Sequence, residues 1–118
     1  MARLKTAILI SGRGSNMQAL IEACAGPDAP AEIVLVLSNK PTAAGLAHAA
    51  SAGIRTAIVP HRDYAERAQF DAALDRALKA AGAELVCLAG FMRLLTPGFV
   101  AAWRDRMINI HPSLLPAF

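Results

Sequence analysis

The chain has 118 residues and a formal net charge of +3, and 55% of its residues are hydrophobic. This length corresponds to one domain or part of one, and the apolar content excludes intrinsic disorder. The basic residues are scattered along the sequence rather than gathered in one stretch. That distribution argues against a nucleic-acid partner and is compatible with an anionic small molecule.

The apolar runs and the two cysteines indicate the cellular compartment of the protein and whether it associates with a membrane. The longest early apolar run, residues 7–10, is far too short for a signal peptide or a membrane span. Cys24 and Cys87 each lie in an apolar stretch without metal-ligand spacing, so we expect buried free thiols in a reducing cytosol. These features predict a soluble cytoplasmic protein with no membrane partner and no metal.

Short apolar runs alternate with helical stretches along the whole chain. The predicted strands are residues 6–10, 33–37, 54–59, 85–88 and 107–110. The predicted helices are residues 16–25, 41–52, 64–81 and 98–104. Such alternation predicts an α/β fold, a Rossmann-like doubly wound parallel sheet with helices on both faces.

In a parallel sheet of this kind, ligands bind at the carboxyl ends of the strands. Three strand ends carry unusual residues here: 11–16, 89–93 and 109–111. The last residues, 112–118, are apolar with no polar tail. We therefore expect residues 1–118 to be one incomplete domain, truncated at the C-terminus, whose apolar end allows self-association.

A glycine turn follows the first predicted strand. Gly12 and Gly14 permit a tight turn and close approach of a ligand, and Ser15 and Asn16 then open a helix. The N–H groups and positive dipole end of a helix N-terminus suit a phosphate. The alternative is an ordinary turn in which Ser15 caps the helix.

The identity of the phosphate ligand stays open at this level. The dinucleotide-binding fingerprint requires a third glycine where Met17 stands. The second strand ends in Ser38, Asn39 and Lys40 rather than in the acidic residue that would bind the ribose of NAD. NADP remains an alternative, because its 2′-phosphate would suit this strand end.

Asn109 and His111 are two residues apart on the last predicted strand, so their side chains point to the same face. A histidine can donate a proton and an asparagine can donate a hydrogen bond to a developing oxyanion, so this pair could polarise a carbonyl. The alternative is that both side chains satisfy backbone groups of a turn.

Four segments together resemble glycinamide ribonucleotide formyltransferase, a family of de novo purine synthesis. They are Ser11-Gly12-Arg13-Gly14-Ser15-Asn16, Ser38-Asn39-Lys40, Leu88-Ala89-Gly90-Phe91-Met92-Arg93, and the segment from Asn109-Ile110-His111 to Pro116. They occur in the family's order and spacing. The chain is thus similar to the amino-terminal portion of that enzyme.

The resemblance implies transfer of a formyl group from 10-formyltetrahydrofolate, a cosubstrate, to the amine of glycinamide ribonucleotide, without a metal. It implies that Asn109 and His111 are catalytic. It implies a substrate-phosphate site at Gly14, Ser15 and Asn16. The implied folate-binding residues are Arg67, Met92, Arg93, Leu94, Leu95 and Asn109.

The family continues beyond this point, with an aspartate that partners the histidine. We therefore expect little or no turnover from the chain as given. The competing interpretations are an NADP-dependent oxidoreductase fragment and a non-catalytic module that binds a phosphate ligand. Sister enzymes that formylate methionyl-tRNA or hydrolyse formyltetrahydrofolate are close alternatives.

Overall fold

The computed structural model describes residues 3–91 and 95–110 of the chain. Its strands form one parallel sheet in the order β3-β2-β1-β4-β5. The strands are β1 (Leu4–Ile10), β2 (Ala31–Ser38), β3 (Thr56–Ile58), β4 (Leu85–Ala89) and β5 (Met107–Ile110). This arrangement confirms the predicted Rossmann-like parallel sheet.

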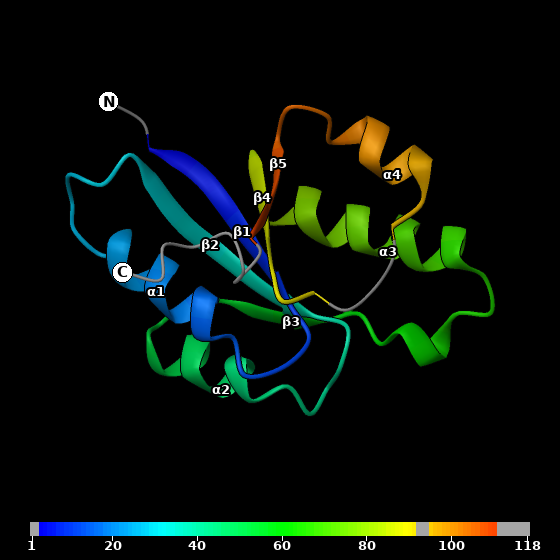
Figure 1. Cartoon of the computed structure of the whole chain (residues 1–118), viewed down its shortest axis with the longest axis horizontal. Coiled ribbons are helices and arrows are strands. Elements are labelled where there is room, and N and C mark those ends of the chain that lie inside the picture. Colours follow the sequence, from blue (N-terminus) through cyan, green and yellow to red (C-terminus); the bar gives the residue numbers. More distant parts are fainter. Residues whose placement is uncertain (1–2, 92–94, 111–118) are drawn as a thin grey trace.

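Helices cover both faces of the sheet (Figure 1). They are α1 (Ser15–Ala23), α2 (Ala44–Ser51), α3 (Arg67–Ala80) and α4 (Pro97–Ala102), with a short 3₁₀ turn, η1 (His61–Asp63). In Figure 1, α1 and α2 lie on one side of the sheet and α3 and α4 on the other. None of the helices within the described ranges is long and apolar enough to cross a membrane.

The central strand β1 supplies side chains to both layers, because successive residues of a strand point to opposite faces. Ala7 and Leu9 pack with the apolar side chains of α3 and α4. Ile8 and Ile10 pack with those of α1 and α2. All four are fully buried, as an unbroken apolar strand predicts for a sheet covered on both faces.

Two predicted boundaries on the α2 side are wrong by a few residues. Helix α2 begins at Ala44 rather than at residue 41, because the backbone first turns where the N–H of Ala43 bonds the carbonyl of Lys40, 3.2 Å away. Strand β3 is shorter than predicted. The N–H of Ile54 is taken by the carbonyl of Ala49 at 3.0 Å, so Ile54 belongs to the exit of α2.

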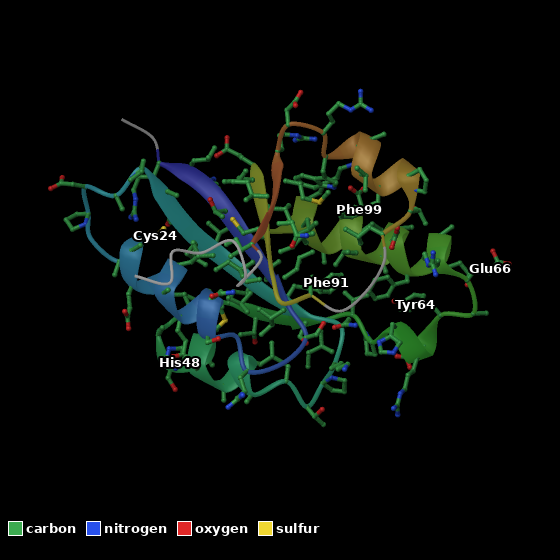
Figure 2. The ribbon with its side chains drawn as sticks, viewed as in Figure 1. Cys24, His48, Tyr64, Glu66, Phe91 and Phe99 are labelled. Carbon is green, nitrogen blue, oxygen red and sulfur yellow. The ribbon has the colours of Figure 1, made fainter. Side chains whose placement is uncertain are left out.

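Helix α3 begins three residues later than its hydrophobic pattern predicts. Tyr64 is extended rather than helical, and its ring packs edge-on against Phe70 with the ring centroids 6.0 Å apart. The apolar side chain at this position therefore contributes to the core without being part of the helix. Figure 2 shows Tyr64 and Glu66 on the segment that leads into α3.

The two cysteines differ in exposure. Cys87 is buried in β4, as predicted, whereas Cys24 is only half-buried at the end of α1, which corrects the prediction for that residue. Burial raises the pKa of the Cys87 thiol, and the neighbouring Cys24 adds to this rise. Both thiols are free.

Candidate functional site

The strand order reverses direction between β1 and β4, because the chain adds β2 and β3 on one side of β1 and β4 and β5 on the other. In open parallel sheets this switch point, at the carboxyl ends of the strands, is where ligands bind. The glycine turn follows β1 and Gly90 follows β4, so the fold places two of the three unusual strand ends at the switch point.

The glycine turn joins β1 directly to α1. Gly14 caps the helix with φ 70°, a left-handed backbone conformation that side chains disfavour, and its carbonyl accepts the N–H of Gln18 at 2.9 Å. A Cβ at this position would also lie 3.2 Å from the Met17 side chain. Ser15 is the first helical residue and not the cap, so the alternative in which its hydroxyl caps the helix is wrong.

The first turn of α1 therefore offers backbone donors beside two polar side chains. The N–H groups of the first helical turn have no acceptor within the helix. Ser15 is exposed and Asn16 is half-exposed, so both can reach a bound group. A Cβ added at Gly12 would meet nothing within 4 Å, which leaves the space over the turn open.

Helix α2 packs against the glycine turn at Gly45. This contact was not predicted from the sequence. The N–H of Gly45 donates to the carbonyl of Gly12 at 3.0 Å. A Cβ at Gly45 would lie 2.6 Å from Cδ1 of Ile10 and 3.1 Å from the carbonyl oxygen of Arg13. The signal in the sequence was a glycine inside an otherwise alanine-rich helix.

A buried polar network holds the start of the turn to the end of β2. The Ser11 hydroxyl donates to Oδ1 of Asn39 at 2.6 Å, and Nδ2 of Asn39 lies 3.3 Å from Nδ1 of His61. Ser11 is 4% and Asn39 is 1% exposed. Asn39 therefore links the turn after β1 to the segment after β3, where His61 lies.

A cavity of about 570 Å³ opens beside this network, at the carboxyl ends of β2 and β3. Its lining comprises residues 39–42 and 60–63. None of the predicted site residues within the described ranges lines it, so this cavity lies apart from the part of the switch point that the structure describes.

Asn109 lies on the face of the sheet that α3 and α4 cover. Leu9, Leu88 and Asn109 are in register across β1, β4 and β5. Leu9 and Leu88 belong to the α3–α4 side of the core, whereas Ile110 packs on the α1–α2 side. At roughly 4.8 Å between neighbouring strands, Asn109 lies two strands, or about 10 Å, from the centre of the sheet.

Two more predicted folate residues lie on this same face. Arg67 is the first residue of α3 and is exposed. Leu95 is half-buried and packs against the core beneath α3 and α4. The predicted phosphate site thus lies on the α1–α2 side of the sheet, and the described part of the predicted folate site lies on the α3–α4 side. Both sites lie at the carboxyl ends of the strands.

Four predicted site residues lie outside the described ranges: Met92, Arg93, Leu94 and His111. Within those ranges, no three His, Cys, Asp or Glu side chains gather as a metal ion would require.

The sequence matches known proteins over nearly its whole length. The family model described as "Formyl transferase" matches residues 4–118. The trifunctional purine biosynthetic protein adenosine-3 of Gallus gallus is 51% identical over 116 residues, which are 98% of this chain and 12% of that protein. Phosphoribosylglycinamide formyltransferase of Haemophilus influenzae is 41% identical over 114 residues, 97% of this chain and 54% of that protein.

Solved structures show the same similarity. Phosphoribosylglycinamide formyltransferase from Brucella melitensis superposes with a TM-score of 0.92 at 48% identity, covering 99% of this chain and 61% of that chain. The chain therefore spans about half to three fifths of the bacterial relatives it matches. At this identity and coverage, the chain belongs to the formyl transferase family.

Proposed function

We propose that this chain carries the phosphate-binding part and a portion of the folate-binding part of a glycinamide ribonucleotide formyltransferase. The reaction is transfer of the formyl group of 10-formyltetrahydrofolate to the amine of glycinamide ribonucleotide. One observation carries the proposal: the glycine turn after β1 and Asn109 on β5 lie at the same edge of the sheet, on either side of the switch point.

The substrate phosphate is proposed to bind at the first turn of α1. Gly14 turns the backbone there so that the N–H groups of Ser15 and Asn16 precede the first hydrogen bond within the helix. These groups, the positive end of the helix dipole and the two side chains can surround a phosphate dianion without a lysine. The bound phosphate would then direct the rest of the nucleotide along the sheet edge.

The formyl group is proposed to bind near Asn109. The substrate amine forms a bond to the formyl carbon, and the carbonyl π electrons move to oxygen. The tetrahedral intermediate then collapses and expels the folate nitrogen, which takes up the proton that the amine releases. The amide N–H of Asn109 would stabilise the oxyanion, a contribution on the order of 10²–10³ in turnover for one such donor. His111 is proposed as the proton donor.

The competing NADP interpretation finds less support. A dinucleotide would require the end of β2 to receive the ribose phosphate. There, however, the Asn39 side chain is buried and engaged with Ser11 and His61. An oxidoreductase would also have no use for Asn109 at the edge of the sheet.

Calorimetric titration with glycinamide ribonucleotide tests the proposal, with NADPH as the comparison ligand. The double variant Ser15→Ala, Asn16→Ala should weaken ribonucleotide binding at least about tenfold, the loss of one to two charge-assisted hydrogen bonds. Ser51→Ala is the matched control, because the exposed Ser51 hydroxyl donates to the carbonyl of Ala47 within α2, away from the glycine turn. Binding of NADPH in preference to the ribonucleotide would overturn the proposal.

A further inference from the structure

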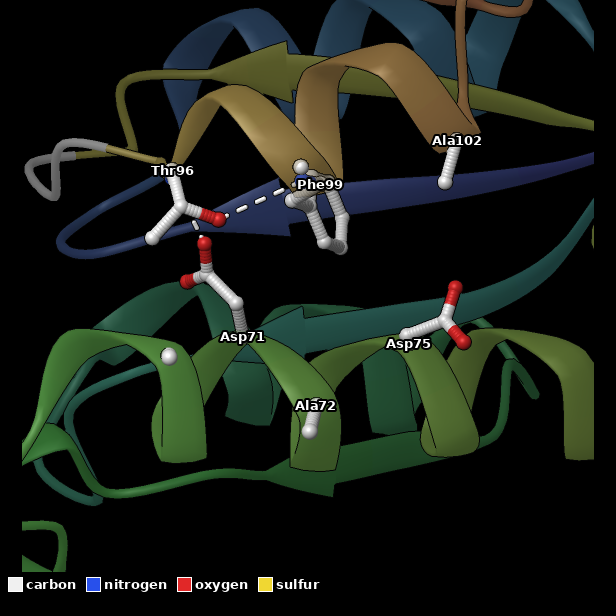
Figure 3. Close-up of a pocket in the computed structure, with 8 residues that line it drawn as sticks. Asp71, Ala72, Asp75, Thr96, Phe99 and Ala102 are labelled. Carbon is white, nitrogen blue, oxygen red and sulfur yellow. Dashed lines mark hydrogen bonds between the residues drawn. The ribbon is translucent and has the colours of Figure 1, made fainter.

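A buried carboxylate joins α3 to the start of α4. Oδ2 of Asp71 accepts the backbone N–H of Thr96 at 2.6 Å, and Asp71 is only 4% exposed (Figure 3). Oδ1 of Asp71 is also buried and has no hydrogen-bond partner within the described residues. Burying a carboxylate is costly, and among the described residues the hydrogen bond from the Thr96 N–H is what offsets that cost.

The hydrogen bond fixes a backbone position. Thr96 caps α4, since its hydroxyl accepts the N–H of Phe99 at 3.2 Å. The Thr96 backbone is therefore held from two sides, by Asp71 through its N–H and by α4 through its side chain. Leu95, the residue immediately before it, is one of the proposed folate residues and is held with it.

The same aspartate is one helical turn beyond Arg67, another proposed folate residue. Residues four apart on a helix lie on the same side. Asp71 thus connects the first turns of α3, where Arg67 lies, to the segment that leads into α4, where Leu95 lies. These two parts of the proposed folate site are otherwise separated by most of α3 and all of β4 in the sequence.

We propose that Asp71 is a positioning residue for the folate site: its hydrogen bond to Thr96 fixes the distance between Arg67 and Leu95. The inference rests on the proposed function, because it requires folate to contact both residues. Asp71 itself does not contact the folate.

The chain supplies a matched control for this role. Asp75, one turn further along α3, accepts the indole N–H of Trp103 at 2.9 Å, just beyond the end of α4. Figure 3 shows Asp75 on α3 toward the Ala102 end of α4. Asp75 also connects α3 to α4, but away from Leu95 and Thr96. A change at Asp75 therefore disturbs the packing of the two helices without releasing the proposed folate residues.

The experiment compares the binding of tetrahydrofolate and of glycinamide ribonucleotide to four proteins by calorimetry: the wild type, Asp71→Leu, Asp71→Asn and Asp75→Leu. Asp71→Leu should weaken folate binding about tenfold, because the Thr96 N–H loses its charge-assisted acceptor and the neighbouring Leu95 is no longer held in place. Asp71→Asn keeps an oxygen that accepts the Thr96 N–H and should restore most of the affinity. Ribonucleotide affinity should be unchanged in all variants.

If Asp71→Leu does not fold, substitutions at Thr96 replace it. Thr96→Pro removes the N–H, and the φ of −70° at this position suits proline. Thr96→Val keeps the N–H and removes only the capping hydroxyl. Weaker folate binding in Thr96→Pro than in Thr96→Val supports the role of the hydrogen bond, and equal binding overturns it.

The outcomes separate this inference from the proposed function. A wild-type chain that binds the ribonucleotide but no folate would overturn the folate part of the proposed function and the inference with it. A wild-type chain that binds folate, with equal losses in Asp71→Leu and Asp75→Leu, would overturn the inference alone. If Asp71→Leu weakened ribonucleotide binding as much as folate binding, the inference would also be overturned, because the substitution would then disturb the whole protein rather than the folate site.

Discussion

The Ser11 hydroxyl and the Asn39 side chain, from the ends of two neighbouring strands, share a 2.6 Å hydrogen bond inside the protein. Asn39 has almost no contact with solvent, and its amide nitrogen faces His61. Removing Asn39 takes this acceptor away from the buried Ser11 hydroxyl, and a buried polar group that loses a partner costs more than an exposed one.

Asn39→Ala should therefore lower the free energy of unfolding by about 1–3 kcal/mol, since the Ser11 hydroxyl then loses its acceptor. Urea denaturation followed by Trp103 fluorescence measures the change. His61→Ala is the comparison, because His61 is half-exposed and water can replace its contacts. A loss in His61→Ala as large as in Asn39→Ala would contradict the assigned importance of the buried Asn39.

Gly45→Ala should destabilise the protein by about 1–3 kcal/mol, because the new methyl group would overlap Ile10 and press on the turn after β1. Gly98 provides a matched control, since both glycines are the second residue of a helix. A Cβ at Gly98 would meet only the Thr96 hydroxyl, at 3.9 Å. Gly98→Ala should thus stabilise the protein by up to about 1 kcal/mol, and thermal melts of the two variants should shift in opposite directions.

Acid should weaken the contact between α3 and α4 through Asp75. Burial by itself raises the pKa of this carboxyl, but hydrogen bonds from Lys79 and Trp103, with the positive charges of Lys79 and Arg106, lower it below its ordinary value of 3.8. A lowered pKa in the folded state means that the stabilisation is present above the unfolded value and is lost as pH falls through the folded one.

Asp75→Asn should consequently lose less stability than the wild type as the pH is lowered below about 4, because asparagine does not titrate. The effect is small, since Asp75 is 25% and Lys79 is 68% exposed and solvent screens the pair. Urea midpoints measured from pH 6 to pH 2.5 test this expectation. Parallel curves for the two proteins would show that Asp75 does not contribute to acid sensitivity.

The two thiols should react at different rates. Cys24 is half-buried near the surface, whereas Cys87 is buried between β1 and β5 with its pKa raised. A thiol reacts as its thiolate, so iodoacetamide should label Cys24 first and Cys87 only after denaturation. Mass spectrometry of the native and the urea-treated protein gives both rates, and first labelling at Cys87 would contradict the described burial.

The parallel sheet could be predicted because apolar runs, glycines and helical stretches alternate regularly along the chain, whereas its strand order comes from the structure. The glycine turn was also predictable, since only its residue types and its place after a strand were needed. The start of α3 was not, because Tyr64 continues the apolar pattern while lying outside the helix. Hydrophobic periodicity reports burial, and an extended residue can be buried as well as a helical one.

The supporting contacts of the site were harder to predict than the proposed binding residues. Asp71 immediately follows Phe70 and precedes Leu74 by three residues, so it lies on the buried side of α3, but a single charged residue there also fits a solvated face. Its partner is the backbone of Thr96, which no side-chain motif marks. Asn39 was likewise considered for a ribose contact, and its actual partners come from segments 28 and 22 residues away.

The central position of β1 has a consequence for how the protein is made. Of the strands in this sheet, the ribosome delivers β1 before β2, β3, β4 and β5, so the glycine turn and the helices that support it can assemble while the later strands are still being synthesised. Strand β4 must then return to the other edge of β1, where the N–H of Lys5 meets the Glu84 carboxylate 79 residues away. The two faces of the proposed site are therefore joined through residues far apart in the sequence, and the proposed phosphate-binding part is synthesised before the proposed folate-binding part.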